Sequence, residues 1–274
     1  MMVLVYKTII ITGGSSGIGA AAARALRARG ATVAITGRSP ETLRLAKEIG
    51  AEGFLADFAK LSDVHALAEQ LLARYPRIDV LANNVGGLIA TRQMTADGHE
   101  KTFQVNHLGG FLLTKLLRER LEASSATVIN TSSAAHRMGR LDVDDLENAR
   151  RYSAWRAYGT AKLMNVLHAA EINRRFRGVQ GVSFHPGVVA TGFAREGGSA
   201  ARFLYESVLR RLFMISPEKG ADTLVWLATT IPVRDWVPGE FYVKRTVAPT
   251  TAQAKDAALA KELWERSERA VGAT

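Results

Sequence analysis

The first half of the chain alternates short, β-branched segments with longer helical patterns, and this alternation restricts its fold more than any other feature. We expect strands at Thr8 to Thr12, Thr32 to Thr36, Gly53 to Ala56, Val80 to Asn83 and Thr127 to Thr131. We expect helices between them at Ile18 to Arg29, Pro40 to Ile49, Leu61 to Arg74 and Gly98 to Leu121. This order is typical of βαβ units, in which parallel strands form one sheet with helices packed on its faces.

The second half continues this pattern without a linker, a repeat or a low-complexity stretch. A helix from Ser153 to Arg175 leads into GVSF, a sixth strand, and EFYV near Phe241 is a candidate seventh. The segment from Gly192 to Ile215 is expected to leave the domain, and Thr251 to Ala270 to form a terminal helix. With 274 residues, 47% of them hydrophobic, the chain is predicted to be a single α/β domain over residues 1–274 with the Rossmann fold, a doubly wound parallel sheet of about seven strands.

The composition excludes several kinds of chemistry. The chain has no cysteine, so it has no disulfide framework, no thiolate nucleophile and no cysteine-based zinc or iron-sulfur site. The apolar stretch in MMVLVYKTIIITGG is too short to span a bilayer, and no cationic region precedes it. We therefore expect a buried strand there, no transmembrane segment and a cytoplasmic protein.

The formal charge of +10, from 36 basic and 26 acidic residues, raises the question of an anionic partner. Such a charge increases non-specific affinity for nucleic acid and anionic membranes. The arginines, however, are scattered in pairs along predicted helices, as at Arg150 with Arg151 and Arg174 with Arg175, and form no basic tail. We favour solvated helix faces and expect no specific nucleic-acid partner, although part of the excess could serve a phosphate-rich cofactor.

A glycine-rich loop, TGGSSGIG, joins the first strand to the first helix. Glycines between a strand and a helix let the main chain approach a pyrophosphate at the helix N-terminus. A tight turn that is glycine-rich only for packing is the alternative interpretation. The predicted cofactor contacts here are Gly13, Ser15, Ser16, Gly17, Ile18 and Gly19, with the two serine hydroxyls facing phosphate or ribose.

The ends of the second and third strands give candidate contacts for an adenosine. Arg38 stands where an acidic residue would accept hydrogen bonds from the ribose, and arginine favours a 2′-phosphate. Asp57 and Phe58 could flank an adenine, with the carboxylate accepting from its amino group. A solvated Arg38 and a loop or capping role for Asp57 are the alternatives. The sequence favours NADP over NAD.

Tyr158 and Lys162 are four residues apart in RAYGTAK, on one face of the predicted helix. Residues at this spacing lie roughly 5 to 6 Å apart at Cβ. A tyrosine with its usual pKa of about 10 needs about 4 kcal/mol of stabilisation of the phenolate to act near neutrality, and an adjacent ammonium can supply it. Such a pair alone more often means a rim tyrosine beside a solvated lysine, but after a glycine-rich loop it indicates redox chemistry on a dinucleotide.

A set of motifs in the order of one known family gives this pair its context. The chain resembles the short-chain dehydrogenase/reductase family, and its HPGVV, SPEKGADT and PGEFYVKR look like the retinol dehydrogenase-like branch. The motifs are TGGSSGIG, NNVGG at Asn83 to Gly87, Asn106, Ser133 in NTSSAAH, YGTAK and HPGVVAT at His185 to Thr191. The resemblance implies an NADP-dependent enzyme for apolar substrates, and members of the family often pair as dimers or tetramers through the helices that follow the fourth and fifth strands.

Each residue of this set has an expected role. Tyr158 is the proton donor or acceptor for the substrate oxygen, and Ser133, at the end of its strand, can hydrogen-bond the same oxygen. By resemblance, Lys162 also holds the nicotinamide ribose and Asn106 anchors a water that links Lys162 to solvent. The further cofactor contacts expected are Asn83, Val85, Gly86, Val189 and Thr191, with Val85 replacing the alanine of the family pattern.

Alternatives stay open for several of these residues. Ser132 could replace Ser133 or satisfy main-chain groups, and Asn106 could be a buried asparagine that bonds main chain. His136 and His185 are expected to serve packing rather than catalysis. The segment from Gly192 to Ile215 is a candidate apolar substrate lid, with a core-facing or oligomer-facing helix, or a membrane-surface role, as its rivals.

The sequence thus predicts an NADP-dependent oxidoreductase that interconverts a carbonyl and an alcohol on an apolar small molecule. A non-catalytic NADP-sensing regulatory protein is the alternative, but it would not need Ser133, Tyr158 and Lys162 together. A sugar-nucleotide epimerase is a third possibility, and the short stretch after the sixth strand leaves little room for its substrate domain.

Overall fold

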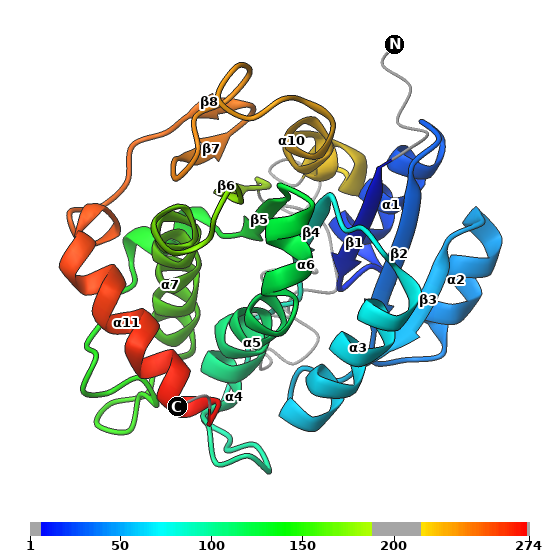
Figure 1. Ribbon diagram of the computed structural model, residues 1–274. Helices are drawn as coiled ribbons and strands as arrows, with labels where there is room; N and C mark the ends of the chain where they lie inside the picture. Colours follow the sequence, from blue (N-terminus) through cyan, green and yellow to red (C-terminus); the bar gives the residue numbers. More distant parts are fainter. Residues whose placement is uncertain (1–6, 188–214, 273–274) are drawn as a thin grey trace.

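The computed structural model describes residues 7–187 and 215–272, which build one sheet covered by helices on both faces (Figure 1). The sheet has eight strands in the order β3-β2-β1-β4-β5-β6-β7-β8; all neighbours are parallel except β7 and β8. The strands are β1 Thr8–Thr12, β2 Thr32–Gly37, β3 Glu52–Leu55, β4 Val80–Asn83, β5 Thr127–Thr131, β6 Gln180–His185, β7 Phe241–Val243 and β8 Thr246–Val247. The order reverses between β1 and β4, and open α/β sheets bind ligands beyond the carboxyl ends of strands at such a point.

The helices form two layers around this sheet. Helices α1, α2 and α10 pack on one face, whereas α3, α5 and α7 pack on the other. The bounds are α1 Gly17–Arg27, α2 Glu41–Ile49, α3 Leu61–Arg74, α4 Lys101–Phe103, π-helix η1 Gln104–Leu108, α5 Gly109–Leu116, α6 Arg118–Ala123, 3-10 helix η2 Ala134–Arg137, α7 Ala154–Arg175, α10 Pro217–Thr229, 3-10 helix η4 Gln253–Lys255 and α11 Ala257–Ala270. Among them no helix is both long and apolar enough to cross a membrane.

The predicted α/β class and doubly wound sheet are confirmed, and β1, β4 and β5 have the predicted bounds. The sheet contains one strand more than the seven expected, because the short β8 turns back antiparallel to β7. Helix α10 was not predicted, although Ser216 and Pro217 carry its signal. Proline favours the first turn of a helix, and the Ser216 hydroxyl accepts a hydrogen bond from the Lys219 N–H at 3.4 Å.

The segment predicted as one helix from Gly98 to Leu121 is divided into α4, η1, α5 and α6. The buried carboxylate of Glu100 starts it by accepting hydrogen bonds from the Thr102 and Phe103 N–H groups at 2.8 and 3.0 Å. At Leu117 the main chain departs from helical angles, with φ −90° and ψ 1°. The π-helical turn places Asn106 at its centre, and π-helical turns are frequent at functional sites.

The predicted terminal helix is present as α11, preceded by η4, and α11 lies alongside α7 (Figure 1). The Trp264 ring packs from α11 onto the layer of α5 and α7, with its centroid 4.8 Å from that of Phe111 on α5 and 5.8 Å from that of Phe176 after α7. Part of the apolar surface of α5 and α7 is therefore covered by the chain's own C-terminal helix. A dimer through these two helices would have to form around α11.

Candidate active site

The glycine-rich loop forms a close turn between β1 and α1. Gly13 and Gly17 adopt left-handed main-chain angles, with φ of 64° and 53°. A Cβ atom at Gly19 would lie 2.3 Å from the Gly13 carbonyl oxygen, so no other residue fits there without movement. The loop and the N-terminus of α1 thus leave a cradle of main-chain groups at the switch point of the sheet, and this cradle fits a dinucleotide pyrophosphate.

The serines of this loop lie toward the end of β2. A Cβ atom at Gly37, the last residue of β2, would lie 3.1 Å from Ser15 Oγ, and the exposed Arg38 follows directly. Ser16 is exposed at the N-cap position of α1, where its side chain makes no capping hydrogen bond. Ile18 is half-buried against the core. Ser15 therefore lies beside Gly37, the residue that precedes Arg38.

Asn84, which sequence reasoning did not select, ties three strand ends together. Its N–H donates to Thr12 Oγ1 at 2.8 Å, its Nδ2 donates to the Thr12 carbonyl at 3.1 Å, and its Oδ1 accepts from Thr131 Oγ1 at 3.1 Å. The next residue, Val85, has its Cα only 3.2 Å from where a Cβ of Gly13 would lie. The loop after β4 is thereby seated against the glycine-rich loop.

Three other predicted cofactor residues are placed mainly inside the protein. The Asn83 amide donates to Thr114 Oγ1 and Asn130 Oδ1 at 2.9 and 3.0 Å, which joins β4 to α5 and β5. Asp57 Oδ1 accepts from the Ala59 N–H at 3.0 Å, so this carboxylate also stabilises a turn. The Phe58 ring is buried against Gly109, and any contact from Phe58 to an adenine would have to come from its main chain.

Tyr158 and Lys162 meet at the carboxyl end of β5. The Lys162 ammonium lies 5.4 Å from the centre of the Tyr158 ring and donates to the Thr131 carbonyl at 3.2 Å. Burial lowers the pKa of Lys162 from 10.5 to about 8. A Cβ atom at Gly86 would lie 2.9 Å from Lys162 Nζ and 2.5 Å from Asn106 Oδ1, so only glycine lets the main chain pass between them.

The two adjacent serines have different surroundings. Ser132 is 1% exposed and its hydroxyl donates to the Lys162 carbonyl at 2.7 Å, which is a structural contact. Ser133 is half-buried, and its Oγ accepts from the Ala135 N–H at 3.2 Å at the start of η2. Leu88, Ala135 and Tyr158 form a small apolar cluster beside it. Ser133 is therefore the serine whose hydroxyl hydrogen remains for a substrate.

Asn106 uses its side chain for main-chain contacts. Its Oδ1 accepts from the Gly87 N–H at 3.0 Å, and its Nδ2 donates to the Gly87 and Thr102 carbonyls at 3.0 and 3.1 Å. Its own carbonyl accepts from Asn165 Nδ2 at 3.0 Å. The structure thus shows the buried asparagine of the alternative interpretation, while a water anchored by Asn106 stays a prediction.

The remaining predicted residues lie behind the site or outside the described chain. His136 is buried and places Nδ1 2.7 Å from the Ser133 carbonyl oxygen, while burial lowers the pKa of His185 to about 4. The His136 ring packs against the Phe241 ring, with centroids 4.7 Å apart, and a packing role for His185 stays a prediction. Val189, Thr191 and the lid from Gly192 onward lie outside the described residues, except Ile215, whose side chain contacts Gly187.

Comparison with known proteins identifies the family. Residues 7–201 match the family model described as short chain dehydrogenase. The chain belongs to this family. It is 48% identical to "Putative daunorubicin C-13 ketoreductase DnrU" of Streptomyces sp. (strain C5), over 98% of this chain and 93% of that protein. It is 35% identical to human retinol dehydrogenase 13, over 97% of this chain and 85% of the relative.

A solved structure gives the same result for the fold. A crystal structure of an uncharacterised protein from Mycobacterium paratuberculosis aligns with a TM-score of 0.78 and 30% identity, over 98% of this chain and 94% of that one. As a short-chain dehydrogenase, the protein is an oxidoreductase that acts on CH–OH groups, and the nicotinamide dinucleotide typical of the family fits the cradle between β1 and β4.

Proposed function

We propose that this short-chain dehydrogenase uses NADP to interconvert a carbonyl and an alcohol on an apolar small molecule, with Tyr158 as the acid/base. The buried contact between Tyr158 and the Lys162 ammonium carries the proposal, because it places a cation beside a phenol at the carboxyl end of β5, on the same edge of the sheet as the glycine-rich loop. NADPH, when bound, supplies the hydride.

The residues of the chain divide the proton chemistry among them. In reduction, the Tyr158 hydroxyl donates its proton to the substrate carbonyl oxygen, and in oxidation the phenolate accepts the proton of the alcohol. Ser133 donates a hydrogen bond to the same oxygen, since its contact with the Ala135 N–H uses a lone pair of Oγ and leaves the hydroxyl hydrogen for the substrate. The Lys162 ammonium favours the phenolate and would hold the nicotinamide ribose.

Two observations support the finer assignments. Arg38 follows β2 next to Ser15, where a guanidinium can bind a 2′-phosphate with charge-assisted hydrogen bonds, and this favours NADP. Leu88 and Ala135 surround Tyr158 with apolar surface, which suits a hydrophobic substrate. The names of two relatives, a putative daunorubicin C-13 ketoreductase and a retinol dehydrogenase, support the interconversion of a carbonyl and an alcohol. A cytoplasmic location stays a prediction.

Replacing Tyr158 with Phe tests the proposal, because the ring remains and only the hydroxyl is lost. A panel of apolar and aromatic ketones and aldehydes is first screened with wild-type enzyme by NADPH oxidation. We expect Tyr158→Phe to lose at least a thousandfold in kcat on the best substrate, while NADPH binding followed by tryptophan fluorescence changes less than threefold. Turnover by Tyr158→Phe close to the wild-type rate would disprove the assignment of the acid/base.

A further inference from the structure

Asn165 shares a hydrogen-bond acceptor with Lys162. It lies three residues further along α7, and its Nδ2 donates to the Thr131 carbonyl at 3.2 Å, the same oxygen that Lys162 Nζ contacts at 3.2 Å. The same Nδ2 also donates to the Asn106 carbonyl at 3.0 Å. One amide group thus joins the end of β5 to the π-helical turn, and its side chain is buried.

The other end of this amide is fixed by a chain of buried polar groups. Asn165 Oδ1 lies 3.2 Å from His107 Nδ1, and His107 Nε2 lies 3.2 Å from Ser267 Oγ on α11. Because Oδ1 can only accept, His107 carries its hydrogen on Nδ1 and accepts the Ser267 hydroxyl at Nε2. Burial lowers the pKa of His107 to about 4, so the ring is neutral and this arrangement is stable at physiological pH.

The groups hydrogen-bonded to the Asn165 amide also fix which way it faces. If the Asn165 amide were flipped, its oxygen would face the Thr131 and Asn106 carbonyls and its NH2 would face the His107 N–H. Both contacts to the carbonyls would then pair acceptor with acceptor, and unpaired buried polar groups cost about 1 to 3 kcal/mol each. The Asn106 and Thr131 carbonyls therefore fix the donor side of Asn165 toward the active site. The His107 N–H supports this orientation through Oδ1, and the Ser267 hydroxyl occupies the other ring nitrogen.

We propose that Asn165 is a positioning residue of the active site, and that the chain from Ser267 through His107 makes helix α11 part of the machinery that seats Lys162. The inference rests on the roles proposed above for Lys162 and Tyr158. Without the amide, the Asn106 carbonyl loses this side-chain donor, and of the two side-chain donors to the Thr131 carbonyl only Lys162 remains. The Lys162 ammonium is then free to turn toward either carbonyl oxygen. Its position beside the Tyr158 phenol is no longer fixed.

A small cavity makes the choice of substitution important. A space of about 10 Å³, lined by Asn106, His107, Asn165 and His168 among others, adjoins these contacts and is large enough for one water molecule. In an alanine variant, water could enter and replace the amide. Asn165→Leu keeps most of the volume and removes both donors, so it tests the hydrogen bonds rather than the space.

The decisive measurement is the pH dependence of kcat/KM for alcohol oxidation, in which the phenolate is the base. For Asn165→Leu and His107→Leu we expect at least a tenfold loss at pH 7 and a shift of the acidic limb to higher pH by about one unit, because the phenol loses its cation. His107→Asn, which keeps a donor at the Nδ1 position, should recover most of the wild-type profile. Ser267→Ala should shift it in the same direction by less.

His168→Leu is the matched control. His168 is also a buried histidine on the same cavity, but its Nδ1 accepts from Asn130 and makes no contact with the Asn165 amide. It should lose stability and keep the wild-type pH profile. Wild-type profiles for folded Asn165→Leu and His107→Leu would overturn the proposal, and so would an equal shift in His168→Leu. Tyr158→Phe in the same series tests the proposed function separately from the role of Asn165. Activity in that variant would disprove the proposed function itself. If Asn165→Leu fails to fold, the pH profiles of His107→Leu, His107→Asn and Ser267→Ala test the proposal instead.

Discussion

Gly139 lies directly against the main chain of Gly159. A Cβ atom at Gly139 would be 2.5 Å from the Gly159 carbonyl carbon and oxygen, and one at Gly159 would be 2.5 Å from the Ala135 carbonyl oxygen. Gly159 follows Tyr158 on α7, whereas Gly139 ends the turn that begins at Ser133. This contact between two glycines sets how closely the serine and the tyrosine approach each other.

We expect Gly159→Ala to separate η2 from α7 and to misplace Ser133 relative to Tyr158. A displacement of this kind can cost about 10²-fold in rate, and we expect a loss of that size in kcat with a smaller effect on NADPH binding. Steady-state kinetics and fluorescence titration measure both. Ala169→Gly, nearly three turns further along the same helix, controls for loss of stability. An unchanged kcat in folded Gly159→Ala would show that the contact is not needed.

The buried Lys162 should make the stability of the cofactor-free protein depend on pH. Its pKa falls from 10.5 to about 8 on burial, so between these values the unfolded chain binds more protons and stability rises with pH. Relative to Lys162→Met, the wild type should gain up to about 3 kcal/mol in free energy of unfolding from pH 8 to 10.5. Urea denaturation over this range gives the difference. Lys47→Met removes an exposed lysine for comparison, and a difference that is flat with pH would contradict the burial argument.

Arg38 should determine the choice between the two nicotinamide dinucleotides. We expect Arg38→Glu to weaken NADPH binding roughly 10- to 100-fold, because hydrogen bonds to charged groups contribute about 1.5 to 3 kcal/mol, and to change NADH binding much less. Fluorescence titration with both cofactors measures the ratio. Lys47→Glu, in the last turn of α2, makes the same change in net charge. Equal weakening of both cofactors by Arg38→Glu would rule out the 2′-phosphate contact.

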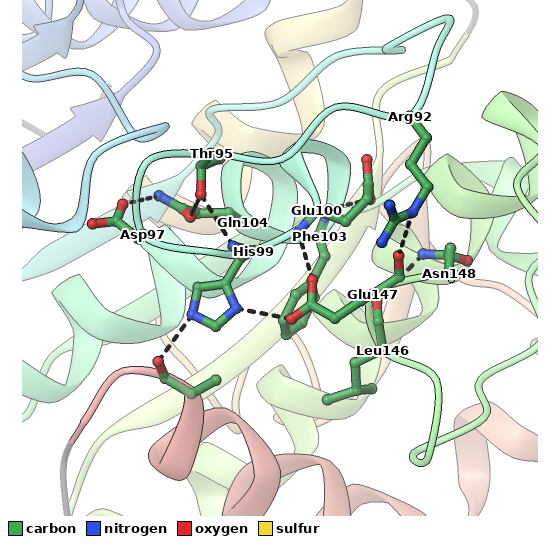
Figure 2. A network of polar contacts seen from close by, with 11 residues as sticks. Arg92, Thr95, Asp97, His99, Glu100, Phe103, Gln104, Leu146, Glu147 and Asn148 are labelled. Atoms are coloured by element: carbon green, nitrogen blue, oxygen red, sulfur yellow. Dashed lines mark hydrogen bonds and ion pairs between the residues drawn. The ribbon is translucent and has the colours of Figure 1, made fainter. Parts of the chain in front are cut away.

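His99 should hold the C-terminal helix in a pH-dependent way. Figure 2 shows its ring between Glu147 and a main-chain carbonyl of α11, with contacts of 2.8 Å to Glu147 Oε1 and 3.0 Å to the Ala270 oxygen. Both partners are acceptors, so only the protonated ring can donate to both. The Glu147 carboxylate raises the pKa of His99 above 6.5, with a smaller contribution from Asp97, while the buried Glu100 also faces Glu147.

Because the pKa is raised in the folded state, this stabilisation is complete below pH 6.5 and is lost as the pH rises through the raised value. The difference in free energy of unfolding between wild type and His99→Leu should therefore be largest near pH 6 and shrink above it. Thermal or urea unfolding across this range checks the sign. In a Glu147→Gln background the pH dependence should disappear, and a difference that grows with pH would refute the ion pair.

Much of the fold follows from local sequence. The strands β1, β4 and β5 have their predicted bounds because each is a short apolar or β-branched run followed directly by glycine, serine or asparagine. Helix α10 was not predicted, although Ser216 and Pro217 encode its start locally. The division of the segment after Gly98 follows from the Glu100 cap and the packing of the π-helical turn, which no periodicity reveals.

The sequence by itself determined the family, the glycine-rich loop and the pair of Tyr158 and Lys162, because these depend on spacings within one loop or one helix. The tertiary structure alone decided that Ser132 is bonded to the Lys162 carbonyl, that Asn84 ties three strand ends and that Asn165 shares the Thr131 oxygen with Lys162. Those contacts join residues up to 72 positions apart in the chain, and the contact between His107 and Ser267 spans 160 positions. A hydrogen bond depends on where atoms lie after folding, and no local pattern records which distant partner a buried polar group will meet.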